Sequence, residues 1–398
     1  MRKSQHAATE LTEADLHHWS LVEDFRERLR KASAKCSISK SWSDEQRQLL
    51  LEDYLSLFLM GLFNPVVRTM RGLCQASRLK RVQREICSRP VSLGSFSEAQ
   101  AVVDPPVLGE VFNQLGLEVR HKHPPAGTPG PGLASRYQWL VQDGSLFEAL
   151  PRMYWAFWRR QGRSEHFQVR LHLSLDLESD SPARASVTPA KKCERAQWRK
   201  QVRPGDAWIG DRYYGENYQL LAELSQLVAF IVRLREEAIL RVEEELPLSA
   251  ADRQAGVIRS AWVKLGRPGR QPEQRFRAVW VQGPKEVLIL VTNLEPEELS
   301  AGEVALLYKK RWQVELFFRW VKCILKCRHW LAESPQGVAI QIYLALIAAL
   351  LLQLYTGCRP TQRMMELIQF YLMGVATLEE LCAGVERQKA RLAQRKKS

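Results

Sequence analysis

The sequence LLYKKRWQVELFFRWVKCIL, residues 306–325, combines a broad apolar face with a compact group of polar side chains. Successive residues of a helix are about 100° apart, which places on one side the apolar residues Leu306, Val314, Phe317, Val321 and Ile324. An arc of about 60° next to that side holds the polar residues Tyr308, Arg311, Glu315 and Lys322. Arg311 and Glu315 have the spacing of an ordinary i, i+4 ion pair on a solvated helix. That interpretation does not require Tyr308 and Lys322 on the same stripe.

These four polar residues are separated by two, three and six positions. The spacing resembles the Y-(2)-R-(3)-E-(6)-K signature of bacterial DDE transposases of the insertion-sequence-four type. The resemblance implies an RNase H-like catalytic core, a mixed sheet flanked by helices, in which three carboxylates surround two divalent metal ions. Glu315 would be one of the three, so two further acidic residues are expected on strands upstream of it.

The region upstream of this signature has the order of elements found in the RNase H-like fold. Alternating or continuous apolar runs predict strands, and the segments between them predict helices. The predicted strands are residues 137–141, 166–177, 183–190, 207–210 and 228–235, and the predicted helices are residues 193–201 and one beginning near 216. Three strands, a helix, a strand, a helix and a strand is the RNase H-like order, in which the first and fourth strands are neighbours.

Asp143 and Asp211 stand at the ends of the first and fourth predicted strands, where this fold would bring them side by side. WLVQDGSLFEALP around Asp143 resembles the first-aspartate segment of the transposase family, and GDAWIGDRYYG around Asp211 resembles its D-R-G-Y segment. Tyr213 occupies the position where relatives usually carry Gly, a difference that concerns the turn rather than the acid. The resemblance therefore implies that Asp143, Asp211 and Glu315 are the catalytic and metal-binding residues.

Phosphodiester cleavage and strand transfer need an activated nucleophile and a stabilised leaving oxygen, and two divalent ions about 4 Å apart supply both. Carboxylate oxygens suit Mg²⁺, so two Mg²⁺ ions per active site are expected, with Mn²⁺ as a substitute. Arg311 and Lys322 cannot ligate cations and are expected to contact phosphates. Tyr308 is expected to hydrogen-bond a phosphate or to stack, and Arg212 of the D-R-G-Y segment is a further expected DNA contact.

The β-rich segment between the second and third acids does not decide whether the reaction passes through a DNA hairpin. Relatives that pass through a DNA hairpin often stack a flipped base on a Trp of this insertion. The corresponding strand here contains Glu286, Val287 and Leu288 instead. Trp262 and Trp280 lie elsewhere in the insertion, where packing in the core is the simpler role.

The chain divides into six predicted segments. They are a helical DNA-end-binding region (1–120), a Pro/Gly linker (121–135), the first part of the core (136–235), the β-rich insertion (236–298), the second part of the core with the signature helix (299–375) and a basic tail (376–398). The tail is expected to have no apolar partner. Within the fifth segment, residues 338–355 approach the length of a membrane span, but they contain two Gln and are interpreted as a buried core helix.

Charge and cysteine content indicate the class of partner and the cellular location. Lys and Arg number 58 against 44 Asp and Glu, and the net charge of +14 favours a polyanionic partner, either nucleic acid or an anionic membrane surface. The eight cysteines include no C-x-x-C pair, which is typical of reduced thiols in a cytosolic protein. A bacterial cytoplasmic location is expected, with association to the nucleoid when DNA is bound.

Taken together, the residues and the resemblance predict a DDE transposase that binds inverted-repeat ends, cleaves there and joins the 3′-OH to target DNA. Its partners would be double-stranded terminal repeats and target DNA, and a homodimer is expected in the DNA complex, with no membrane involved. A structure-specific nuclease of the same fold without strand transfer is the alternative enzyme. A domesticated transposase-derived DNA-binding protein is the alternative without catalysis, and a membrane-surface protein is the weakest alternative.

Overall fold

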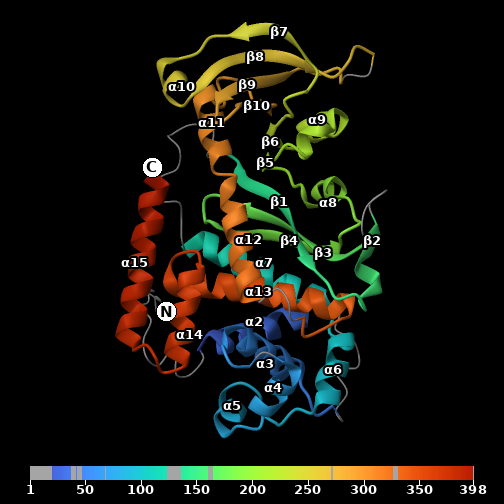
Figure 1. The fold of residues 1–398 in the computed structure, drawn as a ribbon, viewed down its shortest axis with the longest axis vertical. Coiled ribbons are helices and arrows are strands. Elements are labelled where there is room, and N and C mark those ends of the chain that lie inside the picture. Colours follow the sequence, from blue (N-terminus) through green and yellow to red (C-terminus); the bar gives the residue numbers. More distant parts are fainter. Residues whose placement is uncertain are drawn as a thin grey trace.

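A mixed sheet forms the centre of the computed structural model, which describes residues 20–36, 42, 47–67, 69–122, 136–159, 165–269, 272–325 and 330–397. In the described residues the sheet has ten strands in the order β2-β3-β1-β5-β6-β10-β9-β8-β7, with β4 paired to β3. Figure 1 shows the N-terminal helices at one end of the long axis and β7–β10, the last strands of this sheet, at the other. The sheet therefore connects the two ends of the molecule.

The five core strands follow the predicted RNase H-like order. They are β1 (Gln138–Glu148), β3 (Glu165–Asp176), β4 (Ser181–Pro189), β5 (Asp206–Gly210) and β6 (Ala229–Arg233). β3 runs antiparallel to both β1 and β4, whereas β5 runs parallel to β1 and β6 runs parallel to β5. Helix α8 (Glu194–Gln201) precedes β5 and α9 (Tyr218–Ser225) precedes β6. The predicted fold class is confirmed by this arrangement.

Burial on both faces explains why β5 and β6 read as continuous apolar runs. On one face Val141, Ile209 and Ile231 belong to the core shared with the long C-terminal helices. On the other face Trp208 and Phe230 pack in a second core with residues of α8 and α9. All five residues of β5 are buried, as expected for a strand covered on both sides.

Two features of the core differ from the predictions. β1 does not end before Asp143 but continues to Glu148, because the long strand β3 pairs with it throughout, with Asp143 opposite Leu173 and Glu148 opposite Gln168. Asp143 therefore lies in the middle of β1 rather than at its end. A short edge strand, β2 (Phe157–Arg159), was not predicted, and it pairs with the first residues of β3.

The predicted β insertion is present and extends the same sheet. Its strands are β7 (Leu240–Leu246), β8 (Val257–Leu265), β9 (Phe276–Gln282) and β10 (Val287–Thr292), with the short helix α10 (Ala250–Gln254) between β7 and β8. β10 pairs antiparallel with β6, and this pairing joins the insertion to the core. The insertion is thus a continuation of the core sheet and not a separate sheet.

The remaining helices cover the sheet and build the N-terminal region. The N-terminal helices are α2 (Ser20–Lys35), α3 (Leu51–Phe63), α4 (Met70–Ala76), α5 (Lys80–Glu85), α6 (Leu93–Val102) and α7 (Pro105–Lys122). Helix α13 (Pro335–Thr356) packs against α3, α6, α7 and β4. It is long and apolar enough to cross a membrane, but 83% of its most apolar 18 residues are buried inside the protein. The interpretation as a core helix is confirmed.

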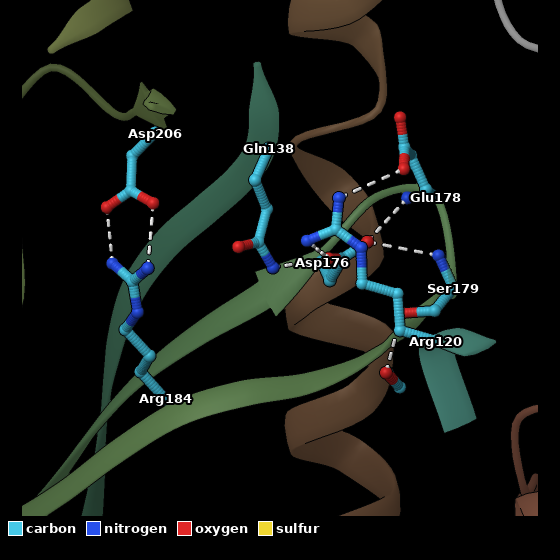
Figure 2. A network of polar contacts seen from close by, with 8 residues as sticks. Arg120, Gln138, Asp176, Glu178, Ser179, Arg184 and Asp206 are labelled. Carbon is cyan, nitrogen blue, oxygen red and sulfur yellow. Dashed lines mark hydrogen bonds and ion pairs between the residues drawn. The ribbon is translucent and has the colours of Figure 1, made fainter. Parts of the chain in front are cut away.

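Acidic residues near the end of β3 hold the N-terminal helices onto the sheet (Figure 2). Arg120 of α7 forms ion pairs with Asp176 at 3.6 Å and with Glu178 at 3.4 Å. The carboxylate of Asp206, at the start of β5, pairs with Arg184 of β4. These side chains are therefore structural, and they lie outside the proposed catalytic residues.

Two predicted segments differ from what the structure describes. The C-terminal segment is helix α15 (Leu378–Lys397), which packs against α14 (Gln362–Leu372). Leu381 and Val385 of α15 are buried, so the prediction of a tail without an apolar partner is wrong. In the predicted linker, residues 121 and 122 complete α7 and residues 123–135 lie outside the described residues.

Candidate active site

The predicted signature helix is two helices, α11 (Ala301–Lys309) and α12 (Trp312–Ile324). At their junction the backbone N–H of Arg311 bonds to the carbonyl of Tyr308 at 2.9 Å, three residues back, which tightens the chain into a turn. α11 packs against β6, β8, β9 and α10, whereas α12 packs against β1, β3, α13 and α14. The prediction of one continuous helix is wrong because each half packs on a different part of the sheet, and no Gly or Pro marks the break.

Asp143 and Asp211 lie side by side, as predicted. The parallel register pairs Val141 of β1 with Ile209 of β5, and two residues further along each chain are the two aspartates on the same face. The carboxylate of Asp143 accepts the N–H of Gly144 at 2.7 Å, and that of Asp211 accepts the N–H of Tyr213 at 2.9 Å. Both carboxylates are therefore held by neighbouring backbone.

The first turn of α12 carries the third acid, Glu315, and Arg311 links it to Asp143. Arg311 donates from Nη2 to Glu315 Oε1 at 2.6 Å, and its Nη1 lies 3.9 Å from Asp143 Oδ2. The side chains of Asp143 and Glu315 are 20% and 30% exposed. The guanidinium of Arg311 thus lies between two carboxylates that solvent can reach.

The neighbouring carboxylates of Asp143 and Asp211 favour the binding of a cation between them. Burial raises the pKa of Asp143 to about 7, the nearby charge of Asp211 adds to that rise, and the Gly144 N–H and the Arg311 guanidinium oppose it. Within the part of the chain that the structure describes, no three His, Cys, Asp or Glu side chains are close enough to hold a metal ion together. Asp143, Asp211 and Glu315 offer carboxylate oxygens, the donors that Mg²⁺ prefers, and in this structure Glu315 is bonded to Arg311.

The other predicted DNA-contacting residues are dispersed. Tyr308 is buried near the end of α11, and burial raises its pKa to about 12, so its hydroxyl remains protonated. Lys322 lies two turns along α12 from Glu315, with its Nζ 5.6 Å from the centroid of the Phe147 ring. Arg212 is exposed in the turn after β5. Tyr308 therefore lies within electrostatic reach of Asp211 and Arg311, whereas Lys322 lies beside Phe147 of β1.

Arg233 is a basic residue at the same edge that sequence reasoning missed. Gly210 pairs with Val232, so the next residues, Asp211 and Arg233, are neighbours across β5 and β6. Its guanidinium forms an ion pair with Glu286 at 2.7 Å, while its buried Nε has no hydrogen-bond partner among the described residues. Arg233 lies within the last predicted core strand, residues 228–235, and no local signal set it apart there.

Glu194, the first residue of α8, is a fourth carboxylate near the site that was also missed. Its side chain lies over Gly144, where an added Cβ would be 2.9 Å from the carboxyl carbon. Arg170 of β3 pairs with it at 2.6 Å. Gly144 faces away from the side of β1 that carries Asp143, so Glu194 supports the site from behind the strand.

Cys193, which precedes α8, is expected to be the most reactive cysteine of the described chain. Burial acts to raise the pKa of its thiol, but the N–H groups of Ala196 and Arg195 stabilise the thiolate and hold the pKa below its usual range. It is exposed, whereas the other described cysteines are buried or half-buried. Iodoacetamide at neutral pH should modify Cys193 first, as measured by peptide mass mapping over time. First labelling of another described cysteine, with Cys193→Ser as the control, contradicts this expectation.

A sheet of RNase H-like order, with two aspartates side by side and a glutamate on a later helix, is the architecture of DDE-type nucleic-acid-processing domains. The chain belongs to the family described as "Transposase DDE domain", which matches residues 134–351. This match includes Asp143, Asp211 and Glu315.

Curated relatives carry transposase names. The chain is 28% identical over 225 residues to a putative transposase, y4zB, of Sinorhizobium fredii, a match covering 55% of this chain and 62% of the relative. It is 26% identical over 216 residues to a probable transposase for insertion sequence element IS5377 of Geobacillus stearothermophilus, covering 54% and 55%. The chain therefore spans little more than half the length of these relatives.

A solved structure, a piggyBac transposase synaptic complex with hairpin DNA, aligns with 97% of this chain and 80% of its own, with a TM-score of 0.41 and 12% identity. That overlap is loose, and the family assignment rests on the sequence matches.

Proposed function

We propose that this protein is a DDE transposase that binds inverted-repeat DNA ends, cleaves phosphodiester bonds there and joins the freed 3′-OH to target DNA. The observation that supports this most directly is the row of Asp143 and Asp211 on neighbouring strands, with Glu315 held nearby through Arg311. Membership of the transposase DDE family supports the same chemistry. The active site would use divalent metal ions, with Mg²⁺ suited to the oxygen donors.

Each residue of the site has a distinct task in this proposal. Two divalent ions, when bound, would supply an activated nucleophile and a stabilised leaving oxygen. Asp143, Asp211 and Glu315 would hold them. Arg311 would exchange its bond to Glu315 for a phosphate of the bound strand, because a guanidinium pairs equally well with phosphate oxygens. This exchange couples arrival of DNA to release of the third acid.

The basic and aromatic residues around this edge would position the DNA strand. Tyr308 keeps its proton and can donate to a phosphate oxygen. Arg233 lies beside Asp211 and would contact the strand near the cut. Lys322 and Arg212 would contact phosphates further along the strand, in keeping with their positions on α12 and in the turn after β5.

Partner and location follow from charge and from the reaction. A net charge of +14 suits a duplex wrapped by several parts of the chain. We place the terminal-repeat contact in the helical region 1–120, where Arg71 and Arg78 are exposed. Joining two ends to one target calls for two copies, so a homodimer on DNA is proposed. A cytoplasmic location is proposed as well, in keeping with the absence of C-x-x-C pairs from the sequence.

Cleavage of a labelled duplex carrying the element's own terminal repeat tests this function. With Mg²⁺ or Mn²⁺ we expect a nick at the repeat boundary and then joined product, and with EDTA we expect binding without cutting. Nicked product that never becomes joined would favour a nuclease of the same fold. Binding without any cutting in either metal would favour the alternative of a DNA-binding protein without catalysis. A hairpin product would show how the second strand is cut.

A further inference from the structure

A groove between the last two helices lies outside the site described above. Helices α14 and α15 are joined by a turn with Gly374 in the left-handed conformation, at a φ of 72°. They approach closely at Gly384, where an added Cβ would be 2.4 Å from Leu367. Beyond that point they enclose a groove of about 850 Å³, lined by Thr361, Gln362, Arg363, Gln388, Arg391, Leu392 and Gln394. We refer to it as the α14–α15 groove.

The α14–α15 groove and the hollow beside it carry net positive charge, from three arginines and one glutamate. Arg363 and Arg391 line the groove, and together with Arg387 they also line the adjoining hollow of about 290 Å³. These three side chains are exposed, and in the described part of the chain none has an ion-pair or hydrogen-bond partner. Glu366, a carboxylate that lines the hollow, accepts a hydrogen bond from Gln362 at 2.9 Å.

Several exposed arginines elsewhere in the protein are neutralised, unlike those of the groove. Arg152, Arg199 and Arg241 each form an ion pair with a neighbouring glutamate. Unpaired guanidinium groups beside amide side chains present hydrogen-bond donors of the kind that phosphate oxygens satisfy.

The position of the groove connects it to the proposed active edge. Arg359, just before α14, donates to the carbonyl of Gln313 in the first turn of α12 at 3.3 Å and pairs with Asp180 at 2.8 Å. Gln313 lies between Arg311 and Glu315 in the chain, so the start of α14 is fixed to the helix that bears the third acid. In Figure 1, α15 rises from α14 to about the level of the α11–α12 junction.

We propose that the α14–α15 groove binds the phosphodiester backbone of duplex DNA away from the bond being cut. This inference rests on the proposed function and adds a second contact surface to it. Arg363, Arg387 and Arg391 make the phosphate contacts, and the side-chain amides of the groove add neutral hydrogen bonds. The terminal-repeat duplex and target DNA present the same phosphates, and comparing two duplexes distinguishes them.

The salt dependence of duplex binding tests this surface. The triple variant Arg363→Gln, Arg387→Gln, Arg391→Gln is compared with wild type on a terminal-repeat duplex and on an unrelated duplex of equal length. The slope of log K against log salt concentration should fall by about 0.9 for each phosphate that is no longer neutralised, so by about 2.7 in total. A fall on the repeat alone assigns the groove to the transposon end, and a fall on both assigns it to DNA of any sequence, including a target.

Two matched variants control for charge and folding. The triple variant Arg152→Gln, Arg199→Gln, Arg241→Gln removes the same formal charge from arginines that are already paired, and it should leave the slope close to that of wild type. The triple variant Arg363→Lys, Arg387→Lys, Arg391→Lys should keep most of the wild-type slope, because the positive charge is retained. The glutamine and lysine variants of the groove should keep the melting temperature of wild type, since the replaced side chains are exposed and lack partners among the described residues.

The outcomes separate this inference from the proposed function. If wild type binds and cuts its terminal duplex but the glutamine variant keeps the wild-type slope, only the groove proposal is overturned. If the variant changes the oligomeric state in sedimentation while its slope is unchanged, the groove contacts a second copy and the proposal is also overturned. If wild type binds neither duplex, the proposed function and the groove proposal both fail.

Discussion

Asparagine at Asp143 or at Asp211 is expected to reduce cutting of the terminal duplex by about 10³-fold or more. Metal ions stabilise such transition states by several kcal/mol, and each 1.4 kcal/mol is about a tenfold change in rate. Asparagine has nearly the same shape, and its carbonyl oxygen can still accept the N–H of Tyr213 that Asp211 accepts. The fold is therefore preserved while one ligand charge is removed.

The measurement is single-turnover nicking with Mg²⁺, together with binding of the same duplex in EDTA. Binding should be unchanged or slightly tighter, because a negative charge near the DNA has been removed. Glu223→Gln is the matched control, since it removes a carboxylate that pairs with Arg199 on the surface of α9, and it should cut normally. Cutting by either asparagine variant within about tenfold of wild type would exclude that aspartate as a metal ligand.

Much of the core was predictable because its signals are local. β5 and β6 are buried on both faces, so they appear in the sequence as short, continuous apolar runs between polar turns. The order of strands and helices along the chain then defines the sheet, and Asp211 was correctly placed at the end of β5. The insertion strands were equally clear, since Gly, Pro and charged residues separate them.

The geometry of the site was less predictable because it depends on tertiary packing. The turn between α11 and α12 keeps Arg311 in the right-handed helical region, so no residue type marks it. Tyr308 therefore belongs to a different helix from Glu315, and a single helical wheel misplaces their side chains. Arg233 reaches the site only through the parallel pairing of β5 with β6, which lies beyond any local pattern.

The prediction for the C-terminal segment was wrong for a related reason. Its lysines and arginines dominate its composition, whereas the buried Leu381 and Val385 provide the apolar contact. Two apolar residues four apart lie on one face of a helix, which is enough when a partner helix, here α14, is already in place. Composition alone could not indicate that partner.

Alanine at Gly215 is expected to damage both stability and cutting. Gly215 lies in the short 3₁₀ helix Tyr214–Glu216 that follows Asp211, and an added Cβ would be 2.3 Å from the backbone carbonyl oxygen of Arg233. Because the obstacle is backbone at the end of β6, it cannot move aside as a flexible side chain would. Overpacking of this kind lowers the free energy of unfolding by about 1–3 kcal/mol or more.

The same displacement should separate Asp211 from Arg233, and a shift of about 1 Å in a positioned group can cost about 100-fold in rate. Gly109→Ala is the control: it lies in α7 with nothing within 4 Å of its Cβ, so it should raise the free energy of unfolding by about 0.5–1 kcal/mol and leave cutting unchanged. Denaturant unfolding and single-turnover nicking, both well below the melting temperature, measure the two effects. A Gly215→Ala protein that is as stable and as fast as wild type would mean that the loop and the end of β6 can separate freely. The placement of Asp211 would then not depend on their contact.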